Sequence, residues 1–392
     1  MKKKNALLAI SVVSLLCACQ QNGTSVLSSS NQPSSADLVS SKYTNSLHLK
    51  LDDDSVVPFY GADPDIIRGN DGYFYLYTSQ NYAYIPGRGR MFDRCPIYRS
   101  EDMVNWTYCS SVFTDQDVDL NSFCFNNAGI WAPSISCFNG QYYLYYSIGY
   151  PWTEVNNHEA YDGIGLAVSD TPYGPWTHYG ELFTSADCGV QVSIDPFAAQ
   201  TDDGTIYLFW GSFNGIWAVE MSIDGIEVKD KANIKNNKIV VVEKGTLGYQ
   251  DLDNGFEATY IFKKDGKFYF TGSRHGFGGG LNSLYDVYAG SSDSLLGPYK
   301  DSKGNDIFGH GDLVVDGDFD DPDGLRGVGH NSIIEDDAGD YWIVYHCYDP
   351  KCPVADERTI CIDKLIFEDD GSFHTAGSVA SHTEVDGPRI YK

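Results

Sequence analysis

Residues 71–77 read Asp-Gly-Tyr-Phe-Tyr-Leu-Tyr, a turn followed by a short run of aromatic and aliphatic residues. Asp-Gly and Asn-Gly are the residue pairs that tight β-hairpin turns favour, because they accept a positive φ angle. Variants of this pattern return four more times along the chain, at residues 139–145, 203–209, 265–270 and 338–344. The chain therefore contains one hairpin signal repeated five times.

The repeats are evenly spaced. Each contains one glycine after the turn residue, and successive glycines lie 62 to 73 residues apart: Gly72, Gly140, Gly204, Gly266 and Gly339. A period of this length holds about four short strands, and helical periodicity is nearly absent between the repeats. We therefore predict an all-β fold, a five-bladed β-propeller with four-stranded antiparallel blades around a central channel. A β-sandwich with a similar number of strands is the alternative, but it would not explain the regular period.

Composition and charge limit the possible partners. The chain has 392 residues, of which 42% are hydrophobic, and its 54 acidic residues outnumber its 27 Lys and Arg to give a net charge of −27. That composition is typical of an ordered globular protein. A surface this acidic repels nucleic acid and anionic lipid headgroups, whereas neutral partners such as sugars remain possible.

The N-terminus has the pattern of an export signal. Three lysines at positions 2–4 precede an apolar stretch at residues 6–16, which is too short to span a bilayer. Residues 16–19 read Leu-Cys-Ala-Cys, which resembles a bacterial lipobox, so we predict a lipoprotein signal peptide over residues 1–18 and lipidation of Cys19. Ordinary cleavage near Ala18 is the alternative. The protein would be exported and held at the bacterial membrane or cell surface only by this lipid anchor.

The next segment is poor in residues that build a core. Residues 19–46 are rich in Ser, Asn and Gln, which predicts a flexible tether, and residues 47–392 are then the propeller domain. Beyond the signal, eight cysteines remain, with no metal-binding Cys-x-x-Cys spacing. We expect buried free thiols, with Cys347 and Cys352 as the pair that would otherwise form a disulfide.

Chemically active residue types occupy the position nine residues before each repeated glycine. Counting back gives three carboxylates, a tryptophan and a histidine: Asp63, Trp131, Asp195, Glu257 and His330. The innermost strand of every propeller blade lines the channel, so equivalent positions meet at one end of it. Taken singly, the Asp-Pro pairs are typical of turns, and the tryptophan and histidine of core residues. Their shared position in the repeat favours one common site.

Converging carboxylates beside an aromatic ring suit the hydrolysis of glycosidic bonds. One protonated carboxylic acid donates a proton to the leaving oxygen, and a second, ionised carboxylate activates water from the opposite face. A third carboxylate raises the pKa of the acid by charge repulsion. An aromatic ring can stack on the apolar face of a sugar.

These motifs resemble glycoside hydrolase family 43, from about Phe59 to the C-terminus. The motifs that resemble the family are Ala-Asp-Pro at residues 62–64, Trp-Ala-Pro at 131–133, Asp-Pro-Phe at 195–197, Glu-Ala at 257–258 and Gly-His-Asn-Ser at 329–332. The resemblance implies an inverting mechanism in which Asp63 is the general base, Asp195 tunes the pKa and orients the acid, and Glu257 is the general acid. Asp65 resembles Asp63 but lies outside the shared position.

The resemblance also suggests substrate and metal contacts. Trp131, Arg274 and His330 are expected to bind substrate. His330 matches a channel histidine that in arabinan-degrading members helps to hold a metal, often calcium, with waters completing the shell. Arg274 paired with a carboxylate or solvated is the alternative. No cofactor is expected for the chemistry itself. Asp-Gly-Asp-Phe-Asp at residues 316–320 does not fit an EF-hand, because Asp321 and Gly327 occupy positions that need Gly and Glu.

The functional prediction follows from the resemblance. We expect an inverting enzyme that cleaves α-L-arabinofuranosyl linkages in plant cell-wall polysaccharide, as an arabinanase or α-L-arabinofuranosidase. β-Xylosidase is the alternative within the family, and a non-catalytic carbohydrate-binding propeller is the alternative of another class. The insertion at residues 80–94, with Tyr82, Tyr84 and Phe92, is predicted to wall one end of the cleft, which favours exo action.

Overall fold

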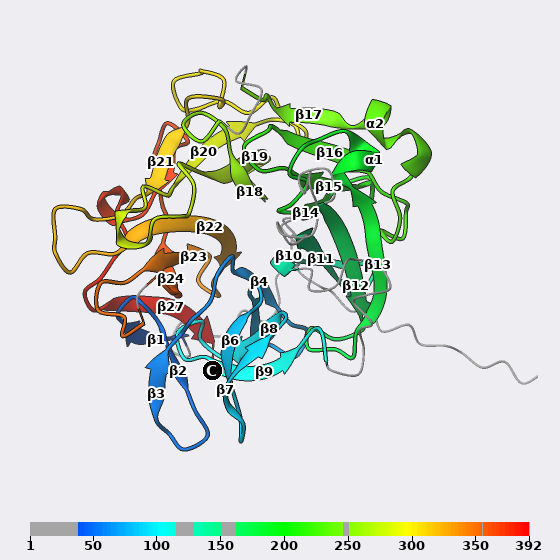
Figure 1. The fold of residues 1–392 in the computed structure, drawn as a ribbon. Coiled ribbons are helices and arrows are strands. Elements are labelled where there is room, and N and C mark those ends of the chain that lie inside the picture. Colours follow the sequence, from blue (N-terminus) through cyan, green and yellow to red (C-terminus); the bar gives the residue numbers. More distant parts are fainter. Residues whose placement is uncertain (1–37, 115–128, 150–161, 246–250, 355, 392) are drawn as a thin grey trace, which may run out of the picture.

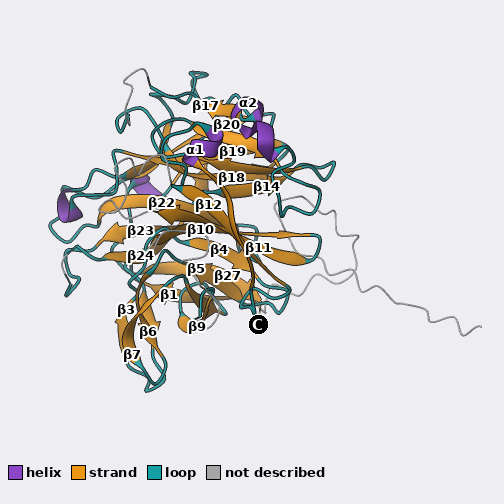
Figure 2. Cartoon of the chain, turned by 45° about the vertical axis from the view of Figure 1, so that its right-hand side comes forward, coloured by secondary structure: helices purple, strands orange, loops and turns teal. Residues whose placement is uncertain are grey.

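The computed structural model describes residues 38–114, 129–149, 162–245, 251–354 and 356–391, and the predicted signal peptide and most of the predicted tether lie outside this range. Five antiparallel sheets follow one another around a common centre in chain order, as Figure 1 shows in colours from blue to red. The predicted five-bladed β-propeller is therefore confirmed. Figure 2 shows that strands dominate and that helices are few and short.

The first four blades each contain four strands in sequence order from the channel outward. Blade one is β4 (Asp65–Arg68), β5 (Phe74–Tyr77), β8 (Pro96–Ser100) and β9 (Thr107–Ser111). Blade two is β10 (Gly129–Phe138), β11 (Gln141–Gly149), β12 (Gly163–Ser169) and β13 (Thr177–Thr184). Blade three is β14 (Phe197–Gln200), β15 (Ile206–Trp210), β16 (Ile216–Glu220) and β17 (Ile239–Val242). Blade four is β18 (Glu257–Lys264), β19 (Lys267–Arg274), β20 (Asp286–Ser292) and β21 (Asp312–Val315).

Blade five has three strands: β22 (Arg326–Glu335), β23 (Tyr341–Tyr348) and β24 (Arg358–Lys364). Three hairpins flank the blades: β2 (His48–Lys50) with β3 (Val56–Pro58), β6 (Asn81–Ile85) with β7 (Gly89–Asp93), and β25 (Ile366–Phe367) with β26 (Phe373–His374). In a fourth two-stranded sheet, β1 (Leu38–Tyr43) pairs with β27 (Val385–Tyr391). The helices are α1 (Ser185–Cys188), α2 (Ile234–Asn237) and the 3-10 turns η3 (Lys231–Asn233), η4 (Gly280–Asn282) and η5 (Ala376–Ser378). No helix among the described residues is long and apolar enough to cross a membrane.

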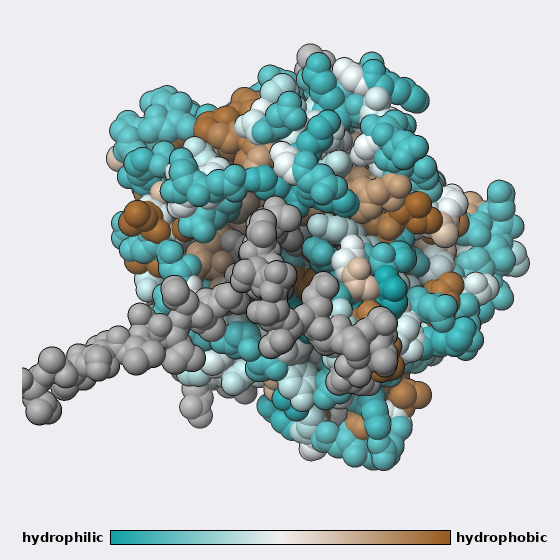
Figure 3. All heavy atoms as spheres, turned by 180° about the vertical axis from the view of Figure 1, so that it is seen from behind, coloured by the Kyte–Doolittle hydropathy of each residue, from teal (hydrophilic) through white to brown (hydrophobic). Residues whose placement is uncertain are grey.

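The repeated glycines make the turns between the first and second strand of each blade. All five have φ between 81° and 90°, a conformation that a side chain would strain. The strands on either side are buried on both faces, because each blade packs between two others; in β11 every residue except Gln141 is buried. The aromatic and aliphatic runs of the repeat thus form the cores between blades. The surface seen in Figure 3 is mostly hydrophilic, with small separate hydrophobic patches.

A ring of hydrogen bonds joins the blades at one end of the channel. In each blade, one residue at the start of the innermost strand has a positive φ angle of 42° to 58°: Asp63, Ala132, Asp195, Ala258 and His330. The backbone N–H of each donates to a side chain of the preceding blade, over 2.7 to 3.1 Å; the acceptors are His346, Ser79, Ser147, Asp195 and Ser273 in the same order. One local geometry is therefore repeated five times at the place where the candidate residues meet.

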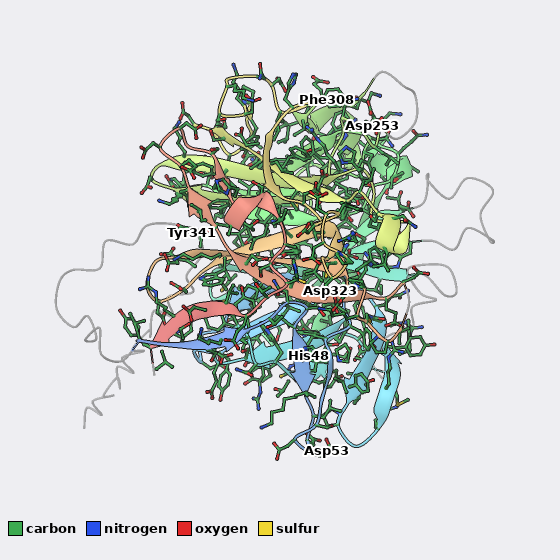
Figure 4. All side chains as sticks on the ribbon, turned by 90° about the vertical axis from the view of Figure 1, so that its left-hand side faces the viewer. His48, Asp53, Asp253, Phe308, Asp323 and Tyr341 are labelled. Carbon is green, nitrogen blue, oxygen red and sulfur yellow. The ribbon has the colours of Figure 1, made fainter. Side chains whose placement is uncertain are left out.

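The N-terminal segment closes the ring, which corrects the predicted tether boundary. We predicted a flexible tether up to Ser46, but Leu38–Tyr43 form strand β1, which pairs with the C-terminal strand β27. Farther along, Leu47 N–H donates to the Ile360 carbonyl, and Ile360 N–H donates to the Phe59 carbonyl, so this segment takes the outer position beside β24. Backbone pairing, which composition does not report, orders these polar residues. The β2–β3 hairpin that follows, with His48 and Asp53, projects at the lower edge of Figure 4.

Most of the described cysteines are free, as predicted: Cys95, Cys109, Cys188, Cys347, Cys352 and Cys361. Cys137 is disulfide-bonded, so the prediction was wrong for this residue. The alternative pair of Cys347 and Cys352 is also wrong, because Cys347 Sγ lies 3.1 Å from Cys361 Sγ across two neighbouring strands and Cys352 is free.

Asn45 supplies a side-chain amide where a further strand would pair with β24, and this generates a stability prediction. Its Nδ2 donates to the Ile362 carbonyl over 2.8 Å, and its Oδ1 accepts from Ile362 N–H over 3.0 Å, while Asn45 is 5% exposed. Asn45→Ala leaves the buried Ile362 N–H unpaired, while the Ile362 carbonyl keeps the Tyr43 hydroxyl as a donor, so we expect a loss of about 1 to 3 kcal/mol of unfolding free energy. Urea denaturation measures it as a lower midpoint with unchanged slope.

Asn237→Ala is the matched control for that variant. Asn237 is exposed and bonds Asp230 at the surface, so its removal is expected to cost less than about 0.5 kcal/mol. Equal midpoints for the two variants would contradict the role given to Asn45.

Candidate active site

The structure brings the three predicted carboxylates to one end of the channel. Asp63, Asp195 and Glu257 are each 5% to 9% exposed, and they lie at the start of blades one, three and four. Besides burial, Glu257 and Asp63 raise the pKa of Asp195, and Asp63 raises the pKa of Glu257. Buried carboxylates this close together cannot all be ionised without paired cations, so their partners decide which of them holds a proton.

One arginine, two histidines and a serine surround the Asp63 carboxylate. Its Oδ1 lies 3.0 Å from Arg358 Nη1, 3.3 Å from His330 Nδ1 and 3.3 Å from His346 Nδ1, and its Oδ2 accepts from Ser79 Oγ over 2.5 Å. Burial alone would raise the pKa of this carboxyl, but Arg358 and the two histidines together lower the pKa well below its ordinary value. Asp63 is therefore ionised at neutral pH.

Glu257 lies in the opposite environment. Burial, together with the charge of Asp63, raises its pKa to about 7, although hydrogen bonds from Tyr285 and Ser212 act in the other direction. Tyr285 OH donates to Oε1 over 2.6 Å, and Ser212 Oγ donates to Oε2 over 2.9 Å. Glu257 therefore holds a proton over part of the neutral range and is fixed in orientation through both oxygens.

Asp195 connects the carboxylates to the ring of hydrogen bonds. Its Oδ2 accepts from Ala258 N–H over 3.1 Å, next to Glu257 in the chain, and its own N–H donates to Ser147 Oγ over 2.9 Å. Burial and then repulsion by Glu257 and Asp63 raise its pKa well above the ordinary value. Asp195 and Glu257 thus compete for ionisation, and they share protons as a pair.

Trp131 is held as a partly exposed surface at the same end of the channel. Its ring lies directly over the backbone of Gly129 and Gly149, where a Cβ on Gly149 would come within 1.9 Å of ring atoms. Two glycines therefore make room for the indole to lie flat, while the side chain keeps an accessible part. This geometry suits stacking on a sugar ring.

His330 lies beside Asp63, but the described side chains around it do not fit a calcium site made by the protein. Burial and the neighbouring Arg358 lower its pKa, against the pull of Asp63, so the imidazole is neutral at neutral pH. Within the described ranges, the one group of three carboxylate or imidazole side chains whose ligand atoms meet is Asp318, Asp321 and His382, which does not include His330. Calcium prefers several oxygen ligands, and an imidazole with one carboxylate does not supply them, so a calcium ion beside His330 would take most of its ligands from water and stays a prediction.

The structure does not support the sugar contact predicted for Arg274. Its guanidinium is buried, donates to the backbone carbonyls of Ile307 and His310, and lies 4.4 Å from the ring centroids of both Phe256 and Tyr288. These contacts hold the positive charge of Arg274 inside blade four, where it does not face the substrate. The pattern around residue 274 did not reveal this, because the two carbonyls lie more than 30 residues farther along the chain.

Two residues that sequence reasoning missed complete the site. Arg358, at the start of β24, pairs with Asp63, and Tyr285, which precedes β20, donates to Glu257. Arg358 begins the third strand of its blade, and Tyr285 directly precedes the third strand of its blade. The sequence comparison used only the positions before the first hairpin of each blade, so it did not include them. Asp65 has a separate role: its carboxylate accepts from Ile66 N–H and Ile135 N–H, which ties blade one to blade two.

The chemistry open to this arrangement is acid–base catalysis on a neutral substrate. An ionised carboxylate paired with Arg358 lies in the same buried cluster as a carboxylic acid with a pKa of about 7, and a flat indole borders the space. That combination meets the requirements for protonating a leaving oxygen and activating water.

Comparison with known proteins agrees with this chemistry. A model of Glycosyl hydrolases family 43 matches residues 53–373. The chain is 26% identical over 333 residues to beta-D-galactofuranosidase xynD of Aspergillus niger, covering 81% of this chain and 82% of that protein. It is 27% identical over 302 residues to extracellular endo-alpha-(1->5)-L-arabinanase 1 of Bacillus subtilis, covering 74% and 83%. For the extracellular exo-alpha-(1->5)-L-arabinofuranosidase ArbA of Cellvibrio japonicus, identity is 28% over 271 residues, covering 64% and 72%.

Solved structures share the fold. An exo-1,5-alpha-L-arabinanase from a bovine ruminal metagenomic library superposes with a TM-score of 0.63 at 25% identity, over 81% of this chain and 97% of that one. A family 43 endo-arabinanase from Bacillus licheniformis superposes with a TM-score of 0.64 at 24% identity, over 84% and 99%. Because the family model spans most of the chain, and the fold and site agree with it, the protein belongs to glycoside hydrolase family 43.

Proposed function

We propose that this glycosidase cleaves α-L-arabinofuranosyl linkages of plant cell-wall polysaccharide, with inversion at the anomeric carbon. The observation that carries the proposal is the contrast between two buried carboxyls of one cluster: the pKa of Asp63 is held low by Arg358, and the pKa of Glu257 is raised to about 7. Arabinan- and arabinofuranoside-degrading enzymes among the relatives support the sugar.

Each carboxylate has a proposed part in the reaction. Asp63, ionised, accepts a proton from the water that attacks the anomeric carbon, while Glu257, protonated, donates its proton to the leaving oxygen as the glycosidic bond breaks. Asp195 shares protons with Glu257 as a pair, which is its part in tuning the acid, and it fixes the backbone beside Glu257 through its bond to the Ala258 N–H. Trp131 stacks on the sugar, and His330 and Arg358 hold Asp63 in place. Protons and charge balance, because one proton enters the cluster and one leaves it.

The substrate is tested by hydrolysis of paired chromogenic α-L-arabinofuranoside and β-D-xyloside, with linear arabinan alongside and product sizing. We expect turnover of the arabinofuranoside to exceed that of the xyloside. Faster turnover of the xyloside would favour β-xylosidase instead. β-Xylosidase is the second candidate because one relative, from Butyrivibrio fibrisolvens, is named xylosidase/arabinosidase.

The proposal includes export with a lipid anchor on Cys19. Two of the relatives are named as extracellular. The basic and apolar pattern of residues 1–18 supports cleavage before Cys19, although these residues lie outside the described ranges. Metabolic labelling with a fatty acid, lost on Cys19→Ser, tests this part of the proposal.

Glu257→Gln is expected to lower kcat by about a thousandfold, because the amide keeps the shape of the side chain and cannot donate the proton. Binding of a substrate oligosaccharide, measured by calorimetry, is expected to change little. Glu335→Gln is the matched control, since Glu335 is an exposed glutamate at the far end of another innermost strand. A Glu257→Gln protein that retains normal kcat would remove Glu257 from the role of acid.

The pH profile of kcat/KM tests the hydrogen bond from Tyr285. Activity requires protonated Glu257, so it falls as pH rises through the pKa of about 7. Tyr285 stabilises the ionised form, so Tyr285→Phe is expected to raise this pKa and move the alkaline limb to higher pH. An unmoved or lowered alkaline limb would contradict the assignment.

The acid limb of the same profile tests Arg358. Because Arg358 helps to keep Asp63 ionised, Arg358→Met is expected to raise the pKa of Asp63, so that activity is lost at a higher pH as the solution is acidified. Arg358→Lys retains the positive charge and is expected to move the acid limb less. Identical acid limbs for the Met variant and the wild type would exclude Arg358 from this role.

A further inference from the structure

The insertion in blade one forms a hairpin with two different faces. Strands β6 and β7 pair Tyr82 with Phe92 and Tyr84 with Arg90, so these four side chains share one face. The opposite face contains Ala83, which is 2% exposed and packs in the core of blade one. We call the face with Tyr82, Tyr84, Arg90 and Phe92 the hairpin platform.

Contacts with the neighbouring blade hold the hairpin platform in place. Arg90 forms a salt bridge with Glu357, and its guanidinium lies 4.6 Å from the Tyr60 ring centroid and 5.6 Å from that of Tyr82. Tyr84 stacks with Tyr60 at 6.5 Å between ring centroids. The hairpin is thus attached to blade five by charge and to the start of blade one by aromatic packing, which limits the freedom it would lose on binding.

Two aromatic rings of this anchored surface remain exposed to solvent. Tyr82 is 52% exposed and Phe92 is 46% exposed, and their rings meet edge to face with centroids 5.7 Å apart. Each ring therefore keeps accessible area although its position is fixed. The sequence-based prediction that the insertion walls the cleft did not anticipate an open aromatic face.

Two sets of contacts link the hairpin to the candidate active site. The residue before its first strand, Gln80, exchanges two 3.0 Å hydrogen bonds with Ile130, next to Trp131. Ser79, one residue earlier, donates to Asp63. On the other side, Arg90 binds Glu357, whose chain neighbour Arg358 binds Asp63. The hairpin is therefore linked to the carboxylate cluster through residues of blade two on one side and of blade five on the other.

The chemistry of the hairpin platform selects a neutral, ring-shaped ligand. Arg90 is paired with Glu357, and the Arg94 guanidinium lies 6.0 Å from the Phe92 ring centroid. The protein as a whole carries a charge of −27, which repels anionic ligands. Exposed aromatic rings instead offer flat apolar surface that matches the C–H face of a sugar.

We propose that the hairpin platform binds a further sugar unit of the polysaccharide chain, beyond the unit whose bond is cleaved. This inference rests on the proposed function and deepens it: Tyr82 and Phe92 make the enzyme prefer chains over single glycosides. The hairpin then extends the binding surface on this side of the site instead of ending it.

The test compares two substrates with the double variant Tyr82→Ala/Phe92→Ala. For a linear arabino-oligosaccharide of six units, we expect kcat/KM to fall about tenfold, because two stacking surfaces are lost. For the chromogenic α-L-arabinofuranoside, kcat/KM is expected to change less than about twofold, since this small substrate does not reach the hairpin platform. Tyr82→Trp/Phe92→Trp, which retains the aromatic faces, is expected to keep the preference for the oligosaccharide.

Tyr179→Ala is the matched control, because Tyr179 is 47% exposed on the outer strand β13 of blade two and is expected to affect neither substrate. If kcat/KM of the double alanine variant falls equally for both substrates, or does not fall for the oligosaccharide, the sugar-binding role of the hairpin platform is wrong and the proposed function is unaffected. If the wild type hydrolyses neither substrate, the proposed function fails. Electrophoresis in native gels that contain arabinan or xylan then tests sugar binding by the hairpin platform. If the polysaccharide retards the wild type but not the double alanine variant, sugar binding is supported. If the substitutions leave the mobility unchanged, the proposal is wrong.

Discussion

Five backbone N–H groups at the start of the innermost strands hold the architecture and the site together. Each belongs to a residue with a positive φ angle and is bound by a side chain of the preceding blade. Serine accepts three of the five, whereas His346 and Asp195 accept the others. At those two boundaries the groups that join the blades also belong to the carboxylate cluster, so the geometry of the site cannot shift without opening the ring. This constraint explains why acidic side chains remain buried there, where apolar ones would pack at lower electrostatic cost.

The asymmetry among the carboxylates comes from the order of the blades around the ring. Blade five lies next to blade one because the ring closes, and it contributes His330, His346 and Arg358 to Asp63. Glu257, between blades three and five, receives neutral donors from Ser212 and Tyr285 instead. Two carboxyls of similar intrinsic acidity are thereby separated into an ionised group and a group with a pKa of about 7.

The repeat made much of this predictable. A fixed period with Asp-Gly or Asn-Gly turns determines the number of blades, and the shared position before each turn identifies Asp63, Asp195 and Glu257 without knowledge of their contacts. The repeat comparison fails for residues that occur in only one blade, which is why Arg358 and Tyr285 were missed. It also fails where partners are remote: Arg274 is held by carbonyls from a later loop, and residues 38–46, polar in composition, are ordered by pairing with the far end of the chain. In blades two and four the left-handed residue follows the predicted position by one, at Ala132 and Ala258, and this offset is a backbone property that residue types do not reveal.

The pairing of β1 with β27 has a consequence for how the protein is made. Leu38 pairs with Tyr391, so β1, the first strand that the structure describes, has no partner until residues 385–391 have been synthesised. Contacts of such long sequence separation form late, because the entropy of closing a large loop must be overcome first. The ring is sealed only at the end of folding, and a chain shortened by its last strand would leave both the first strand and the outer edge of the structure open to pairing with other molecules.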